Sequence, residues 1–263
     1  MDRTRTGGRV FRRLLYAADR SAASRAALMA VAGLAVGGRT EVVVLHVDDR
    51  GQLEEGRRLV TDIACSLIAL AVDARPELRQ APPGRVAAAI AAVAAEQGSN
   101  LVVLGSRGRS DLGGLLPGSV AHEVVERVSC PLLLVRAGRR ASARRRRVLV
   151  AVAGDEDLAE LVRTAAAVAE RDAQVLVLHV PTPGAADSGA VAPEQLVEQV
   201  VDGLRRRGVR VRGRIEAGAS GATREIARAA VGYGADLVVM GSRRLPALAA
   251  LLEVPSAVAG VKG

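Results

Sequence analysis

The sequence predicts an α/β fold made of two tandem Rossmann-like domains, each a parallel β-sheet flanked by helices. One observation is an internal repeat, because three segments recur at a nearly constant spacing of about 135 residues. The second observation is the alternation of strand and helix patterns within each half. The recurring pairs are "RLLYAAD" at 13–19 with "RVLVAVA" at 147–153, "EVVVLHV" at 41–47 with "QVLVLHV" at 174–180, and "NLVVLGSRG" at 100–108 with "DLVVMGSRR" at 236–244.

The first half reads as five strands with helices between them. Its strands are continuous Val/Leu runs, which indicates a sheet covered on both faces. Ser21 is a good N-cap for the first helix, and Gly37-Gly38 ends it. The expected strands are 13–18, 41–47, 77–80, 101–104 and 131–136, and the expected helices begin near 22, 53, 85 and 119.

The second half repeats this order but is shorter at its end. Its expected strands are 147–152, 174–180, 210–216 and 237–240. Only 23 residues follow Met240, too few for both a final helix and a fifth strand. Either the last strand is missing or the end is rebuilt. The expected division is 1-137 for the first domain, 138-146 for an Arg-rich linker and 147-263 for the second.

The composition limits the possible partners. The formal net charge is +9, yet Lys262 is the one lysine and aromatic residues make up 1% of the chain. Arginine usage of this kind reflects compositional bias, and the lack of aromatic stacking platforms argues against single-stranded nucleic acid. The run "RAGRRASARRRR" at 136–147 is read as a solvated linker, with a patch for nucleic acid or acidic partners as the alternative.

No apolar run is long enough to span a bilayer, and no secretory signal is recognised, so we expect a cytoplasmic protein without membrane insertion. Cys65 and Cys130 lie in apolar segments and are expected to be small buried hydrophobes. His46 and His179 each end an apolar run, which predicts a structural role. No spacing of His and Cys indicates a metal site.

A glycine-rich segment follows the strand at 101–104. Gly105 is followed after two residues by Gly108, and nine residues later by Gly118 and Ser119. Glycines let the backbone approach a phosphate, and a helix that starts at Ser119 adds N–H donors and partial positive charge. The segment lacks the lysine of a Walker A loop. It therefore suits an anion such as a triphosphate.

This spacing resembles the universal stress protein (UspA-type) family. The first strand that ends in Asp19, the "LHV" strand end and "CPLLLVR" at 130–136 agree with it. The resemblance covers nearly the whole chain as two copies. It implies a five-stranded, adenine nucleotide alpha hydrolase-like fold in each copy. It also implies ATP binding where the glycine motif is complete. Mg²⁺ is expected only because triphosphates carry it.

The resemblance assigns roles to ten residues of the first copy. Asp19 matches the acidic residue near the adenosine, and Ala17 and Val47 match positions beside the base. Arg107 matches a phosphate-loop position, although exposed loop arginines are common. The remaining positions match the loop that holds the phosphates: Leu104, Gly105, Gly108, Gly118, Ser119 and Val120.

The second copy departs from the motif. Ala153 stands where Asp19 does, Arg244 replaces Gly108, and Val254 and Pro255 replace Gly118 and Ser119. Side chains there would crowd a close backbone approach, and proline lacks an N–H donor. We therefore expect that the second copy does not bind ATP in the same way.

The leading hypothesis is a nucleotide-dependent regulatory protein in stress adaptation, with an unknown protein partner. A scaffold that makes no use of nucleotide and a slow ATP hydrolase using Asp111 are the alternatives. The resemblance implies that copies pair through their fifth strands. Without a fifth strand in the second copy, the edge at 131–136 has three possible partners: another chain, the C-terminal tail, or the second copy in some other arrangement. Of these we expect a homodimer.

Overall fold

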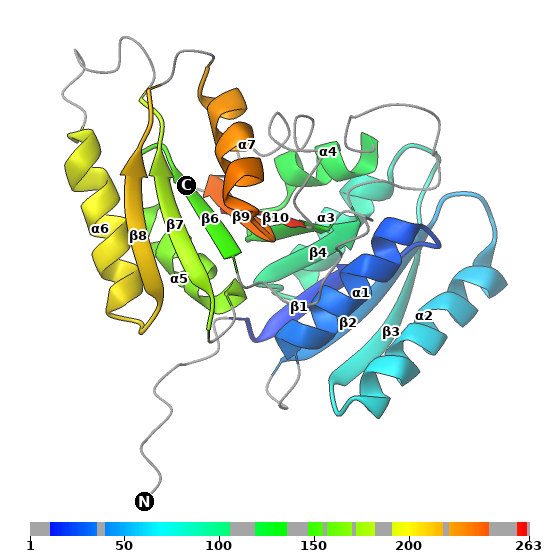
Figure 1. The fold of residues 1–263 in the computed structure, drawn as a ribbon. Helices are drawn as coiled ribbons and strands as arrows, with labels where there is room; N and C mark the ends of the chain where they lie inside the picture. The colour runs from blue at the N-terminus through cyan, green and yellow to red at the C-terminus, as the bar shows by residue number, and fades with distance from the viewer. Residues whose placement is uncertain are drawn as a thin grey trace, which may run out of the picture.

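The computed structural model describes residues 11–35, 40–105, 119–135, 147–154, 157–169, 172–181, 191–217, 221–241 and 257–261. Within these ranges ten strands form one continuous sheet in the order β3-β2-β1-β4-β5-β10-β9-β6-β7-β8 (Figure 1). The first copy comprises β1 (Arg13–Ala17), α1 (Ala22–Ala35), β2 (Glu41–Asp48), α2 (Leu53–Ala69), β3 (Asp73–Gln80), α3 (Val86–Glu96), β4 (Leu101–Gly105), α4 (Ser119–Arg127) and β5 (Leu132–Val135). The second comprises β6 (Arg147–Val152), α5 (Leu158–Val168), β7 (Gln174–His179), α6 (Pro193–Arg205), β8 (Arg210–Ile215), α7 (Ala222–Tyr233), β9 (Leu237–Gly241) and β10 (Ala257–Val261).

The strands within each copy are parallel, which confirms the predicted fold class of two tandem Rossmann-like domains. Each copy is doubly wound. Its first strand lies between the second and fourth strands, so the chain builds outward in both directions from the centre. Figure 1 shows the two copies side by side along the sheet.

The suggestion that the second copy lacks a fifth strand is wrong. β10 pairs in parallel with β9 and antiparallel with β5, with Ala257 opposite Val135. The copy is still shortened, because 15 residues separate β9 from β10 where 26 separate β4 from β5. The edge of β5 is therefore covered within the same chain. The homodimer stays a prediction, but an unpaired β5 edge no longer supports it.

Helices cover both faces of the sheet, which explains the continuous apolar strands. One core layer joins α1, α2, α5 and α6 to the sheet, and it includes Leu14, Leu67 and Leu161. The other joins α3, α4 and α7, and it includes Leu45 and Ile90. Small Ala and Val side chains fill most of both layers, as the scarcity of aromatic residues requires.

Local signals set several helix ends. Ser21 caps α1 as expected, since its Oγ accepts a hydrogen bond from the backbone N–H of Ser24 at 3.0 Å. Asp157 caps α5 through the N–H groups of Ala159 and Glu160. Gly234 ends α7 in the left-handed conformation that glycine adopts without strain, at φ 65°.

The two histidines have the structural role that the sequence predicts. Nδ1 of His46 lies 2.8 Å from the carbonyl oxygen of Ala18, and Nδ1 of His179 lies 2.8 Å from that of Val152. Each ring ties the end of its strand to the end of the neighbouring central strand.

The prediction for the two cysteines is wrong, since Cys65 is exposed and Cys130 is partly exposed. The buried face of α2 runs through Val60, Ala64 and Leu67, and Cys65 lies beside that stripe rather than on it.

In the part of the chain that the structure describes, no helix is long and apolar enough to cross a membrane.

Candidate functional site

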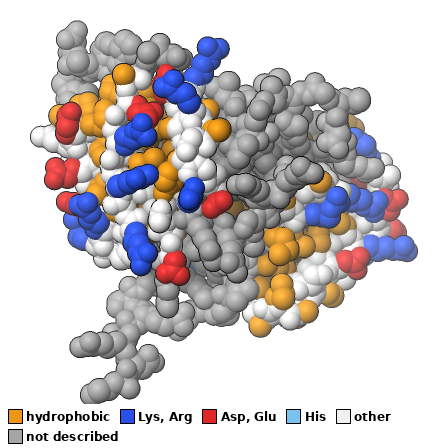
Figure 2. All heavy atoms as spheres, in the orientation of Figure 1, with side chains coloured by type: hydrophobic (Ala, Val, Ile, Leu, Met, Phe, Trp, Pro, Cys, Tyr) orange, Lys and Arg blue, Asp and Glu red, His pale blue; other side chains and the backbone are white. Residues whose placement is uncertain are grey.

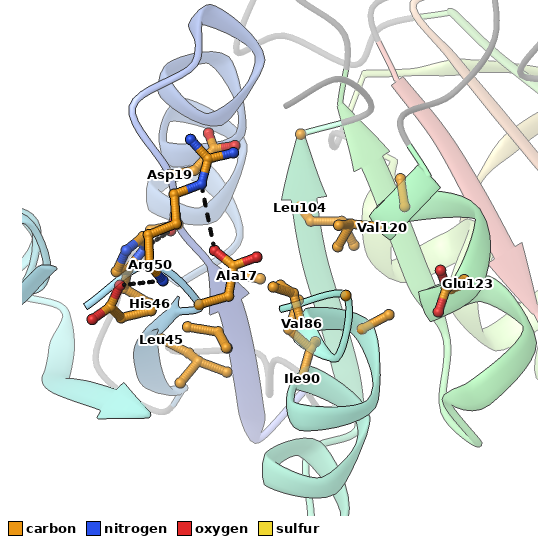
Figure 3. A pocket seen from close by; sticks show the side chains of 18 of the residues that line it. Ala17, Asp19, Leu45, His46, Arg50, Val86, Ile90, Leu104, Val120 and Glu123 are labelled. Atoms are coloured by element: carbon orange, nitrogen blue, oxygen red, sulfur yellow. Dashed lines mark hydrogen bonds and ion pairs between the residues drawn. The ribbon is translucent and has the colours of Figure 1, made fainter. Parts of the chain in front are cut away.

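A cavity of about 380 Å³ lies at the carboxyl ends of β1, β2 and β4 in the first copy (Figure 3). From β1 the sheet extends through β2 to β3 on one side, and from β4 to β5 on the other, so the direction of winding reverses between β1 and β4. Open α/β sheets bind ligands at such a switch point. Its size falls within the range of small-molecule sites. The lining residues are Ala17, Ala18, Asp19, Leu45, His46, Val47, Asp48, Asp49, Arg50, Gln52, Gly84, Val86, Ala87, Ile90, Leu104, Gly105, Val120, Ala121 and Glu123.

One part of the cavity wall is apolar. Leu45 comes from β2, Val86 and Ile90 come from the first turns of α3, Leu104 comes from β4 and Val120 comes from α4. Figure 3 shows Val86 and Ile90 on α3, below Leu104 at the end of β4. A slot with apolar side chains on both sides can hold a flat ring by burying its faces.

Asp19 lies where β1 turns into α1. Its Oδ1 accepts a hydrogen bond from the N–H of Ser21 at 2.9 Å, and its own N–H donates to Ser24 Oγ at 3.0 Å. These two bonds hold the turn and fix the position of the carboxylate at the cavity. The second carboxylate oxygen adds an acceptor for a hydroxyl or amine of a ligand.

Tyr16 holds this turn in place through hydrogen bonds to Ser24. Its hydroxyl donates to the carbonyl oxygen of Ser24 at 2.7 Å and lies 2.8 Å from Ser24 Oγ. The side chain is fully buried, and this burial raises the pKa of Tyr16 to about 12, with a smaller contribution from the charge of Asp19. The phenol therefore stays neutral and keeps its hydrogen bonds throughout the physiological range.

The turn after β2 forms a second side of the cavity. Asp48 is buried there, and its Oδ1 accepts from the N–H of Arg50 at 3.0 Å. The backbone N–H of Gln52, together with that of Arg50, stabilises the charged carboxylate and lowers the pKa of Asp48. Asp49 and Arg50 follow, with 3.7 Å between the Asp49 Oδ1 and Arg50 Nε atoms. The turn thus carries two carboxylates and one guanidinium beside the apolar slot.

Gly105 ends β4 at the cavity and also touches α1. A Cβ atom at this position would lie 2.7 Å from the backbone N of Ser24 and 2.8 Å from the carbonyl C of Ala23. Such distances exclude any side chain unless the backbone moves. Close packing against α1 is therefore a sufficient reason for glycine here, apart from any contact with phosphate.

The structure brings six of the ten predicted site residues together at the cavity. They are Ala17, Asp19, Val47, Leu104, Gly105 and Val120. Ser119 is the first residue of α4, which begins beside this group. Arg107, Gly108 and Gly118 lie outside the described residues, as does Asp111.

In the second copy, the counterpart of Asp19 is Ala153, directly after β6, so this end of the sheet lacks a carboxylate at that position. The other replaced positions lie outside the described residues: Arg244, Val254 and Pro255.

Sequence reasoning missed several lining residues. His46, Arg50, Val86, Ile90 and Glu123 come from the end of β2, the turn after it, the start of α3 and the start of α4. The signal was present in the predicted topology, because all carboxyl ends of parallel strands meet at one edge of the sheet. The segments that follow the second and third strands therefore reach the same site as the glycine-rich motif.

Among the residues that the structure describes, no group of three or more His, Cys, Asp or Glu side chains is arranged to hold a metal ion. The acidic residues at the cavity come from three separate parts of the fold. Asp19 follows β1, Asp48 ends β2 with Asp49 directly after it, and Glu123 lies on α4.

Comparison with protein families gives one match that covers most of the chain. The model of the universal stress protein family matches residues 11–136 and 144–259. The universal stress protein YxiE from Bacillus subtilis (strain 168) is 49% identical over 43 residues, which are 16% of this chain and 29% of that protein. The match therefore covers less than a third of the length of this curated relative.

Several solved structures resemble nearly the whole chain, and two examples show the range. A universal stress protein from Archaeoglobus fulgidus DSM 4304 aligns with a TM-score of 0.73 and 18% identity, covering 95% of this chain and 96% of that chain. A protein of unknown function from Pseudomonas aeruginosa PAO1 aligns with a TM-score of 0.64 and 16% identity, covering 97% of this chain and 93% of that chain. At these identities the likeness extends to the fold, including its two-copy arrangement.

Proposed function

The chain belongs to the universal stress protein family, and from this premise we propose that its first copy binds ATP in the cavity between β1, β2 and β4. The observation that carries the proposal is the convergence of Asp19, Val47, Leu104, Gly105 and Val120 on one cavity at the switch point of the sheet. These residues are far apart in the sequence. The family resemblance of the sequence assigns each of them to nucleotide contact.

The apolar slot suits the adenine ring. Leu45, Val86 and Ile90 supply aliphatic surface, and the end of β2 at Val47 offers backbone polar groups at the rim. The Asp19 carboxylate suits the ribose, because a charged acceptor binds hydroxyl donors more strongly than a neutral one. Slot and carboxylate together fit a nucleoside.

The phosphates extend in this proposal from Gly105 toward the start of α4. A nine-residue helix beginning at Ser119 directs free N–H groups and a partial positive charge to that side. The sequence between β4 and α4 holds Gly108 and Gly118, and Arg107 adds a cation that can pair with phosphate. Mg²⁺ accompanies the triphosphate rather than occupying a site built by protein ligands alone.

We propose that ATP acts as a regulatory ligand, in the cytoplasm, within a stress response. Occupancy of the cavity links the turns after β1 and β2 to α4, so bound nucleotide changes the surface that these segments offer to a protein partner. In the second copy, Ala153 replaces the acidic residue, and that copy serves in packing and partner contact.

Calorimetric titration of ATP, with and without Mg²⁺, into the full chain and two variants tests the proposal. Asp19→Ala removes a charged hydrogen-bond acceptor and is expected to weaken binding by about ten- to a hundredfold. Gly118→Val is expected to abolish it. Asp62→Ala removes an exposed carboxylate of α2 and serves as the matched control. Equal affinity in all four proteins, or no binding to the wild type, would contradict the proposal.

A further inference from the structure

Three arginines lie on one face of the outermost strand of the second copy. Arg210, Arg212 and Arg214 alternate along β8, and all three are exposed. Alternate residues of a strand share a face and lie about 6.8 Å apart. Gly213 faces the opposite side, since a Cβ there would lie 2.5 Å from Cγ1 of Val197 on α6. The arginines therefore form a regular row on the face away from α6.

The corresponding row in the first copy carries mixed charges. β3 pairs with β2 in the register that β8 has with β7, so Asp73, Arg75 and Glu77 match Arg210, Arg212 and Arg214. The internal duplication thus supplies a matched comparison of one position in the fold. The row changes from two acidic residues and one arginine to three arginines.

The arginines of β3 are neutralised by nearby carboxylates. Arg75 lies 3.3 Å from Glu41 and 3.1 Å from Glu77, and Arg79 lies 2.9 Å from Glu77 and 2.8 Å from Glu96. The charges of the β3 arginines are therefore compensated within the first copy itself.

The partners of that network are absent from the equivalent positions around β8. Gln174 replaces Glu41 in the neighbouring strand, and Gly232 stands on α7 where α3 has Glu96. Arg214 pairs with Glu216 at 2.6 Å, whereas Arg210 has no carboxylate partner among the described residues. Within the described ranges, the row of three arginines therefore makes one ion pair with a carboxylate.

Tyr233 holds the middle arginine of this row in place. The guanidinium of Arg212 lies over the Tyr233 ring, 5.5 Å from its centre, and the Tyr233 hydroxyl donates to the carbonyl oxygen of Gln174 at 3.0 Å. A guanidinium stacked on an anchored ring keeps its N–H groups directed outward at low entropic cost. Figure 2 shows arginine side chains gathered over the side of the molecule where Figure 1 has β8 and α7.

β8 is also the last strand of the sheet. Among the described residues it pairs with β7, and no strand pairs with its other edge. Unpaired strand edges bind extended peptides by adding a strand, with the side chains of alternate residues falling on each face. On the α6 face the edge presents Val211 and Ile215, and Ile215 is 39% exposed. One face of an added strand would meet arginines and the other would meet aliphatic side chains.

We propose that β8 binds an extended acidic peptide segment of a partner protein as an eleventh strand of the sheet. Its Asp or Glu residues alternate with apolar residues, so that each acidic side chain lies opposite or diagonal to an arginine. A single-stranded nucleic acid fits less well, because Tyr233 is the one aromatic residue among those described around the row, and bases need several stacking platforms.

Fluorescence anisotropy with a labelled eight-residue peptide in which glutamate alternates with valine tests this proposal on the full chain. A second peptide has the same composition with the glutamates in one block, and a ten-residue oligothymidylate represents nucleic acid. The variant protein carries Arg210→Gln, Arg212→Gln and Arg214→Gln. The control carries Arg57→Gln, Arg58→Gln and Arg127→Gln, which removes three exposed arginines from α2 and α4 of the first copy.

The alternating peptide is expected to bind the wild type and the control equally, and to bind the β8 variant about tenfold more weakly. Higher salt should weaken binding, since the contacts are exposed ion pairs. Circular dichroism of the β8 variant must match the wild type, which separates lost binding from lost folding.

Three results would overturn the proposal. Equal affinity for the blocked peptide would mean that bulk charge, rather than strand addition, governs binding. Tighter binding of oligothymidylate with the same loss in the β8 variant would assign the row to nucleic acid. Absence of binding of the alternating peptide to the wild type at low salt would show that the β8 row does not bind acidic peptides.

Discussion

Gly105 lies against Ser24 so closely that a Cβ atom on Gly105 would come within 2.7 Å of the Ser24 backbone nitrogen. This contact joins the end of β4 to the first turn of α1. It also links the cavity wall to the turn that carries Asp19, since Ser24 Oγ accepts a hydrogen bond from the Asp19 N–H. The first glycine of the glycine-rich motif is therefore required by the packing of the fold.

Gly105→Ala is expected to destabilise the protein by about 1–3 kcal/mol, because the added methyl group overpacks against backbone atoms that cannot move independently. Urea unfolding measures the change. Gly232→Ala is the matched control: Gly232 lies in α7 with open space around it, so alanine there should raise the free energy of unfolding by about 0.5–1 kcal/mol. Equal effects of the two substitutions would contradict the packing argument.

The buried phenol of Tyr16 predicts a loss of stability at high pH. Its pKa is raised to about 12 in the folded protein against 10.0 ordinarily. The stabilisation is complete below about pH 10 and is lost as the pH rises toward 12, because the unfolded chain releases the proton first. Tyr16→Phe should remove this part of the pH dependence of the melting temperature.

Direct titration checks the same group. The chain has two tyrosines and no tryptophan, so absorbance of the Tyr233→Phe variant reports Tyr16 alone. We expect a midpoint near 12 while the protein stays folded. A midpoint near 10 would show that the hydroxyl is exposed to solvent and that the Tyr16–Ser24 contact is wrong.

Asp48→Asn tests the turn after β2. The backbone N–H groups of Gln52 and Arg50 stabilise the charged carboxylate, so its pKa is lowered. A lowered pKa means that the stabilisation is present above about pH 4 and is lost as the pH falls through the lowered value. The variant should melt at a lower temperature than the wild type at pH 7. The difference should shrink in acid, and a difference that is constant with pH would contradict the electrostatic cause.

The repeat, the parallel sheets and most strands could be predicted from the sequence, because buried strands such as β1 and β4 contain continuous apolar runs, "LLYA" and "LVVL". The edge strand β3 was recognised only from Glu77 onward. Its first half contains alternating polar residues and Pro76, which is tolerated because β3 is the outermost strand.

β10 could not be recognised from local pattern. Its sequence "AVAGV" is short, with small residues and a glycine, which have low intrinsic strand preference. Its conformation depends on pairing with β9 on one side and with β5 on the other, and β5 lies more than a hundred residues earlier. Such long-range pairing is invisible in a short window of sequence.

The candidate site was half predictable for a related reason. Residues that lie within the recurring motif, such as Asp19 and Leu104, were found by their spacing. Val86 and Ile90 carry no motif and reach the cavity because α3 packs over β2. Their identity as aliphatic residues was readable, but their position required the packing of α3.

The stoichiometry of ATP binding to the full chain, measured by isothermal titration calorimetry, tests the central claim most directly. We predict one ATP per chain, bound in the first copy, a weakened site in Asp19→Ala and loss of that single site in Gly118→Val. Two equivalent sites per chain would contradict the assignment of one functional and one degenerate copy. Absence of binding would contradict nucleotide recognition by the cavity altogether.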